Sequence, residues 1–297
     1  MDSLAAVRAG VRRALIRGAS VVAPSAVERM LIARFCTPSR RDGAPNGEMG
    51  EEWTIRSGRE AIEIYSDGTT PRVLFVHGWD GAARDFAIMA TAFRRAGYGT
   101  VAFDHPAHGR STGRSATLPE LAYAILDVAR ATGPFDAVVA HSLGASATLL
   151  ALRDGLPTRC AILIAPPYDA RPFIRELGTY IGVTDARIRG AIARLERTVD
   201  VVGGRELDRI AARIATPGLV LHDRFDRAVP FTHGVAVAAA WPRSRFVALE
   251  GLGHRRVLDA PDIHERILTF IRQSTAGPPS ALRDSARRVA TAETEAP

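Results

Sequence analysis

The stretch DAVVAHSLGAS, residues 136–146, decides the fold. Four apolar residues (137–140) indicate a buried strand, and a second apolar run begins soon after Ser142. Between the two runs the sequence reads AHSLG (140–144), which is close to G-x-S-x-G. In that pattern a tight turn from strand to helix lifts a serine above the sheet and leaves room only for small neighbours. The stretch therefore predicts a strained serine at the carboxyl end of a buried strand.

Apolar runs alternate with helical patterns along most of the chain. Expected strands are 61–65, 72–77, 99–103, 135–140, 160–165, 218–222 and 245–249, and expected helices are 83–96, 118–131, 143–153, 232–240 and 262–273. Short continuous apolar strands separated by helices are typical of a parallel sheet that is covered on both faces. Residues 168–215 contain three helical patterns and no strand, so we expect a helical insertion there.

Two side chains downstream can serve a serine nucleophile. A serine hydroxyl needs an adjacent base, and the base needs a carboxylate to orient it. Asp226 follows an expected strand in HDRFDRAVP, and His254 follows the last one in LEGLGHRRVL. Because both strands should end at the same edge of the sheet, we expect Ser142, Asp226 and His254 to share one cleft.

An oxyanion formed by attack on an acyl group needs backbone N–H donors. The expected strand 72–77 ends in HGWDG (77–81), and Leu143 follows the serine. The N–H groups of Trp79 and Leu143 are therefore the expected oxyanion hole.

Taken together, the chain resembles the α/β-hydrolase superfamily over roughly residues 53–273. The matching motifs, in order, are HGWDG (77–81), DHPAHGRS (104–111), AHSLGA (140–145), DRFDRAVP (223–230) and GLGHRRVL (251–258). The resemblance implies an α/β-hydrolase fold: a mostly parallel eight-stranded sheet with helices on both faces and a helical cap between strands 6 and 7. It also implies a Ser-His-Asp triad with no cofactor and no metal. Ala140 and Ala107 stand where the family usually has glycine.

The resemblance also bears on two ambiguous groups of residues. Asp223 competes with Asp226 for the role of the acid, and Asp226 is favoured because it stands three residues before Val229, as the family's acid does. Asp104 and His108 are expected to fix the loop after the fourth strand by hydrogen bonds. A metal site formed by Asp104, His105 and His108 is the alternative.

The expected function is that of a serine hydrolase, of the carboxylic ester hydrolase type, that cleaves an ester or thioester through an acyl-enzyme on Ser142. An acyltransferase with the same triad and a non-catalytic protein that binds a small ligand are the alternatives. The expected partner is a small acyl ester or thioester. The oligomeric state is not readable from the sequence.

The amino-acid composition limits the possible mechanisms, partners and cellular location. All 39 basic residues are arginine, which excludes every mechanism that needs a lysine, and the net charge is +7. No basic cluster is interleaved with aromatic residues, so nucleic acid is not an expected partner. The two cysteines form no disulfide framework, which fits a cytoplasmic location.

The ends of the chain differ from its middle. Residues 1–50 are expected to be an N-terminal helical extension and linker, followed by a hydrolase core (51–167 and 216–273), a cap insertion (168–215) and a disordered tail (274–297). A helical stripe is formed by Leu4, Val7, Val11 and Leu15. A helix packed on the domain is the favoured interpretation of that stripe. A membrane-surface contact through residues 1–20 and an export signal are the alternatives.

Overall fold

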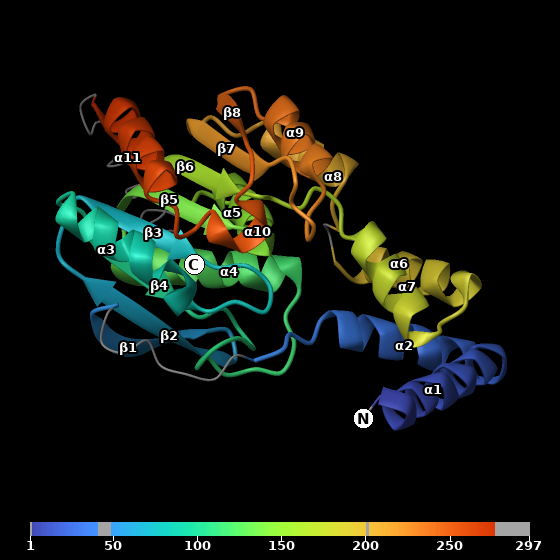
Figure 1. The fold of residues 1–297 in the computed structure, drawn as a ribbon. Helices are drawn as coiled ribbons and strands as arrows, with labels where there is room; N and C mark the ends of the chain where they lie inside the picture. Colours follow the sequence, from blue (N-terminus) through green and yellow to red (C-terminus); the bar gives the residue numbers. More distant parts are fainter. Residues whose placement is uncertain (1, 41–48, 200–201, 277–297) are drawn as a thin grey trace, which may run out of the picture.

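The computed structural model describes residues 2–40, 49–199 and 202–276 (Figure 1). Their centre is a single sheet in the order β1-β2-β4-β3-β5-β6-β7-β8. The strands are β1 (Glu51–Ser57), β2 (Glu60–Asp67), β3 (Arg72–Val76), β4 (Gly99–Phe103), β5 (Phe135–His141), β6 (Thr158–Ile164), β7 (Gly218–Asp223) and β8 (Ser244–Leu249). β2 runs in the direction opposite to the other seven strands, so the predicted eight-stranded, mostly parallel sheet is confirmed.

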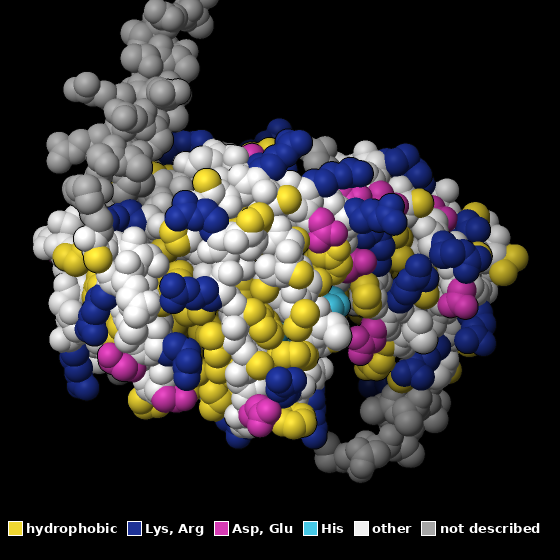
Figure 2. All heavy atoms as spheres, turned by 90° about the horizontal axis from the view of Figure 1, so that it is seen from above, with side chains coloured by type: hydrophobic (Ala, Val, Ile, Leu, Met, Phe, Trp, Pro, Cys, Tyr) yellow, Lys and Arg dark blue, Asp and Glu magenta, His cyan; other side chains and the backbone are white. Residues whose placement is uncertain are grey.

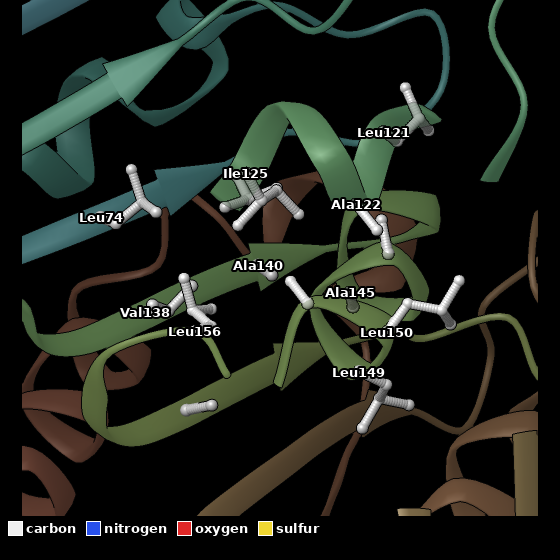
Figure 3. Packing of buried hydrophobic residues seen from close by; sticks show 14 of the residues in the cluster. Leu74, Leu121, Ala122, Ile125, Val138, Ala140, Ala145, Leu149, Leu150 and Leu156 are labelled. Carbon is white, nitrogen blue, oxygen red and sulfur yellow. The ribbon is translucent and has the colours of Figure 1, made fainter. Parts of the chain in front are cut away.

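Helices cover both faces of the sheet. Leu74 and Val138 contribute to a core shared with α4 (Leu118–Thr132), α5 (Leu143–Arg153) and α9 (Phe231–Ala240), part of which is drawn in Figure 3. Val73 and Phe75 point to the other face, into a core shared with α3 (Ala87–Arg95) and α11 (Pro261–Thr275). Successive strand residues thus alternate between two apolar layers, as the continuous apolar runs predict.

Three helices are inserted between β6 and β7, which confirms the predicted insertion. They are α6 (Arg171–Ile181), α7 (Asp185–Thr198) and α8 (Arg205–Ala211). The chain begins with α1 (Asp2–Val22) and α2 (Pro24–Phe35), and Figure 1 shows both beside α6 and α7, away from the sheet. Leu31 of α2 packs with Ile174 and Ile188 in a third apolar cluster. The N-terminal helices therefore share a core with the insertion.

A buried carboxylate connects α2 to α7. Glu28 is 8% exposed, and its Oε1 accepts a hydrogen bond from Nη1 of Arg187 at 3.0 Å. Arg194 Nη2 lies 3.7 Å from the other oxygen. A Cβ at Gly190 would lie 2.1 Å from Oε1 of Glu28, so a larger residue there would displace the Glu28 carboxylate from this position. Arg187 and Arg194 of the insertion thus face the N-terminal extension.

The first described helix, α1, lies in the predicted N-terminal extension, and the last, α11, reaches the start of the predicted tail. α1 packs on α2 and α6, but Val11 and Leu15 of the expected stripe point to solvent. The packing face is formed by Ile16, Ala19 and Ser20 instead. At the other end, Ser274 and Thr275 belong to α11, and the rest of the tail expected to be disordered lies outside the described residues from residue 277 onward.

Candidate active site

A strained turn holds Ser142 between β5 and α5. Its φ is 52° and its ψ is −129°, in a region that residues with a side chain rarely adopt. A Cβ at Gly144 would lie 2.2 Å from the backbone oxygen of His77. A Cβ at Gly78 would lie 2.7 Å from Cβ of Ser142. The small residues at 78 and 144 thus let two backbone segments close tightly around the serine.

The two alanines at glycine positions have different surroundings. Ala140 is fully buried in the core beside Ala145, and Figure 3 shows both between β5 and α5. Ala107 has a φ of 66°, where a Cβ is strained by about 1–2 kcal/mol. The family's usual glycine is therefore explained at position 107, whereas Ala140 needs no glycine-like backbone.

A chain of hydrogen bonds connects three of the predicted site residues. His254 Nε2 lies 3.1 Å from Oγ of Ser142, and its Nδ1 lies 2.7 Å from Oδ2 of Asp226. The other carboxylate oxygen of Asp226 accepts the N–H groups of Ala228 at 2.8 Å and Val229 at 2.9 Å. The three side chains expected to meet are therefore within hydrogen-bonding distance in this order.

The environment of Asp226 keeps its carboxylate charged. Burial pushes its pKa up, but hydrogen bonds from His222, His254 and the N–H of Val229 outweigh burial and hold the pKa far below the usual value. A charged acceptor at this place fixes the proton of His254 on Nδ1. The lone pair of Nε2 then faces the hydroxyl of Ser142.

Asp223, the competing carboxylate, has a different set of partners. Its Oδ1 accepts the N–H of Phe225 at 2.8 Å, and its Oδ2 accepts the N–H of Leu252 at 2.7 Å. Leu252 stands two residues before His254. Asp223 thus ties together the two loops that carry Asp226 and His254, and both its oxygens are engaged with backbone N–H groups.

Two further histidines support the site, and sequence reasoning did not assign them these contacts. His141 Nε2 lies 2.8 Å from the backbone oxygen of His254, and the two rings are 4.6 Å apart. His222 Nε2 lies 3.5 Å from Oδ2 of Asp226. Both stand inside quoted motifs, one beside the serine and one at the start of HDRFDRAVP, which is the only signal the sequence offered for them.

The expected oxyanion donors have suitable positions in the chain. Leu143 is the first residue of α5, and the first N–H groups of a helix have no acceptor within that helix. Trp79 follows Gly78, whose backbone runs beside Ser142, and the Trp79 side chain lines the cavity described below.

The loop after β4 is organised around Asp104. Its carboxylate accepts the N–H groups of Ala83 and Arg110, both at 2.8 Å, and the hydroxyl of Tyr65 at 3.2 Å. His108 Nδ1 lies 2.9 Å from the backbone oxygen of Pro106. Within the described residues, no group of three or more His, Cys, Asp or Glu has the arrangement of a metal site.

An apolar cavity of about 320 Å³ opens beside Ser142 and His254. Its wall combines the end of α2, the insertion and the sheet-covering helices, through residues that include Phe35, Cys36, Phe173, Leu195 and Leu207. Burial, together with Glu120, raises the pKa of the Cys36 thiol to about 11, so this thiol is neutral at pH 7. Ser142, which has His254 beside it as a base, is therefore a better candidate nucleophile than Cys36.

A model of the alpha/beta hydrolase family matches residues 73–263, which is more than half of the chain. The chain belongs to this family. The match spans the turn at Ser142, the insertion and the loops that carry Asp226 and His254. No curated protein matches the sequence.

Solved structures of other α/β hydrolases share the fold. A lipase-like protein from Acinetobacter baumannii AYE, described as a putative lipase, has 15% identity and a TM-score of 0.60, over 84% of this chain and 97% of the other. Est1E from Butyrivibrio proteoclasticus, solved with ferulic acid, has 20% identity and a TM-score of 0.60, over 76% and 100%. A thermophilic esterase from Thermogutta terrifontis, solved with malate, has 16% identity and a TM-score of 0.59, over 76% and 99%. At these identities the likeness is one of fold.

Proposed function

We propose that this α/β hydrolase is a carboxylic ester hydrolase that acts on small esters or thioesters through an acyl-enzyme on Ser142. The observation that carries the proposal is the hydrogen-bonded series Ser142–His254–Asp226, beside an apolar cavity. The charged Asp226 holds the imidazole tautomer that takes a proton from the serine hydroxyl. A structure described as a thermophilic esterase, with the same fold, agrees with this reaction class.

In the proposed reaction, Ser142 Oγ attacks the acyl carbon while His254 Nε2 takes its proton. The N–H groups of Trp79 and Leu143 stabilise the oxyanion. His254 then returns the proton to the leaving alcohol or thiol, and water, activated by the same nitrogen, releases the acid. The apolar wall of the cavity suits an acyl group without charge.

A fluorophosphonate probe tests the nucleophile directly. The wild-type chain should be labelled, and Ser142→Ala should lose the label and on the order of 10⁴-fold in kcat on an ester panel. Ser146→Ala is a matched control, because Ser146 lines the same cavity and its hydroxyl bonds to the backbone oxygen of Pro167 at 2.6 Å. Labelling of a folded Ser142→Ala variant would refute the assignment. Adding an alcohol acceptor to the assay separates hydrolysis from acyl transfer.

A further inference from the structure

The first helix has two very different sides. Residues 8–22 read RAGVRRALIRGASVV. On one side, Ile16 and Ala19 are partly buried against the third apolar cluster, and Ser20 is buried. The guanidinium of Arg13 lies over the ring of Tyr180 in α6, 5.4 Å from its centre. This side holds α1 on α2 and α6.

A neighbouring face of α1 exposes an apolar stripe to solvent. Val11 is 56% exposed, Leu15 is 69% exposed and Val22 is 86% exposed. Their spacing of four and seven residues places them on one face of the helix. Val21, beside the end of the stripe, is 80% exposed. A helix of a folded chain usually turns such a stripe inward, so an outward one indicates an interaction surface.

Arginines border this stripe along one edge. The helical repeat places Arg8 and Arg12 along that edge and Arg17 on a different face of α1, and all three are exposed. Residues 8–22 contain no acidic residue. By contrast, Figure 2 shows arginine and acidic side chains together on the face seen from above. A cationic edge beside exposed aliphatic side chains, with no acidic residue to balance it, is typical of helices that lie in a lipid–water interface.

We propose that α1 docks this face on an anionic lipid surface. Val11, Leu15 and Val22 would enter the headgroup region, and the bordering guanidinium groups would bind lipid phosphates. A second copy of the chain fits the surface less well, because a twofold contact through α1 would bring arginine against arginine. The docked helix continues directly into α2, whose end lines the cavity through Phe35 and Cys36.

Vesicle binding of the full chain tests the proposal. We expect binding to phosphatidylcholine vesicles that contain phosphatidylglycerol, weak binding to pure phosphatidylcholine, and loss of binding as salt is raised. Two triple variants should each weaken the binding at least tenfold: Arg8→Gln with Arg12→Gln and Arg17→Gln, and Val11→Ser with Leu15→Ser and Val22→Ser. All six side chains face solvent, so the circular dichroism spectrum should not change.

Matched control variants distinguish the effect of the α1 surface from a general effect of charge or of exposed apolar side chains. Arg56→Gln with Arg59→Gln and Arg266→Gln removes the same charge from exposed positions elsewhere. Ile88→Ser with Tyr123→Ser and Val235→Ser removes exposed apolar groups elsewhere. Equal loss of binding in these controls would overturn the proposal, as would failure of the wild-type chain to bind anionic vesicles. A dimer in solution that only the α1 variants dissociate, with no lipid binding, would assign the surface to a second copy instead.

Discussion

The imidazole of His222 lies against the carboxylate of Asp226. Nε2 lies 3.5 Å from Oδ2 of Asp226 and 3.0 Å from the backbone oxygen of Val229. Both neighbours are acceptors, so Nε2 carries the proton and donates it. The ring is fully buried, and a Cβ at Gly234 would lie 2.3 Å from its Nδ1. Asp226 therefore contacts two histidines: His254, which lines the cavity, and His222, which is fully buried.

His222→Phe should lower kcat by roughly tenfold, because it removes one donor from the proposed triad acid while it keeps a ring of similar size. His222→Gln, which keeps an N–H donor, is expected to restore part of the rate. Equal rates of His222→Phe and His222→Gln would leave His222 with a packing role alone.

The two neighbouring aspartates should differ in kinetic effect. Asp226→Asn offers His254 a neutral amide and favours the wrong tautomer, so we expect a loss approaching 10⁴-fold in kcat. Asp223→Asn keeps one acceptor oxygen for the N–H of Phe225 or Leu252 and should lose far less activity. Steady-state rates of the two purified variants on one ester decide the ranking. The reverse order would transfer the role of the acid to Asp223.

The central strands could be predicted from sequence because they are buried on both faces, and burial leaves a continuous apolar run. The edge strand β1 could not be delimited in this way. Its sequence EEWTIRS is exposed over most of its length, so it carries no such run. The turn at Ser142 was also readable, since close backbone contacts at Gly78 and Gly144 demand small residues there.

Contacts between segments that are far apart in the chain could not be predicted from the sequence. Glu28 binds Arg187, which is 159 residues later in the chain, and no local sequence pattern predicts that pair. The role of α2 in walling the cavity follows from the same long-range packing. The stripe on α1 was visible in the sequence, but a helical period does not say whether a stripe faces a core or the outside. His222 shows the same limit, because its contact with Asp226 depends on how the loop after β7 folds back.

Glu28 should stabilise the attachment of the N-terminal helices. Glu28→Ala leaves Arg187 and Arg194 without their buried acceptor, so we expect the free energy of unfolding to fall by roughly 1–3 kcal/mol. Both arginines are about one third exposed, which keeps the loss below that of a fully buried pair. Urea titration measures the change, and proteolysis between α2 and β1 should accelerate. Glu176→Ala, an exposed position on α6, is the control. Equal effects of the two substitutions would contradict the importance of the buried contact.

Mild acid should destabilise the fold through its buried histidines. Burial, assisted by the nearby His254, lowers the pKa of His141 to about 3, and burial with the nearby His77 lowers the pKa of His108 to about 3. In the unfolded chain an imidazole has a pKa of about 6.5, so below that pH the unfolded state binds more protons than the folded state. Stability is therefore complete above pH 6.5 and is lost as the pH falls toward 3.

At pH 4.5 each of these two histidines should cost about 2 kcal/mol of stability relative to pH 6.5. Most ordinary carboxylates remain charged in this window, so the loss reports mainly on histidine. Urea denaturation at pH 7.0, 5.5 and 4.5 measures it. His108→Asn should reduce the slope of stability against pH by about 1.4 kcal/mol per pH unit, whatever it does to stability at pH 7. A stability that stays constant from pH 7.0 to 4.5 would mean that these rings are not held neutral in the folded chain.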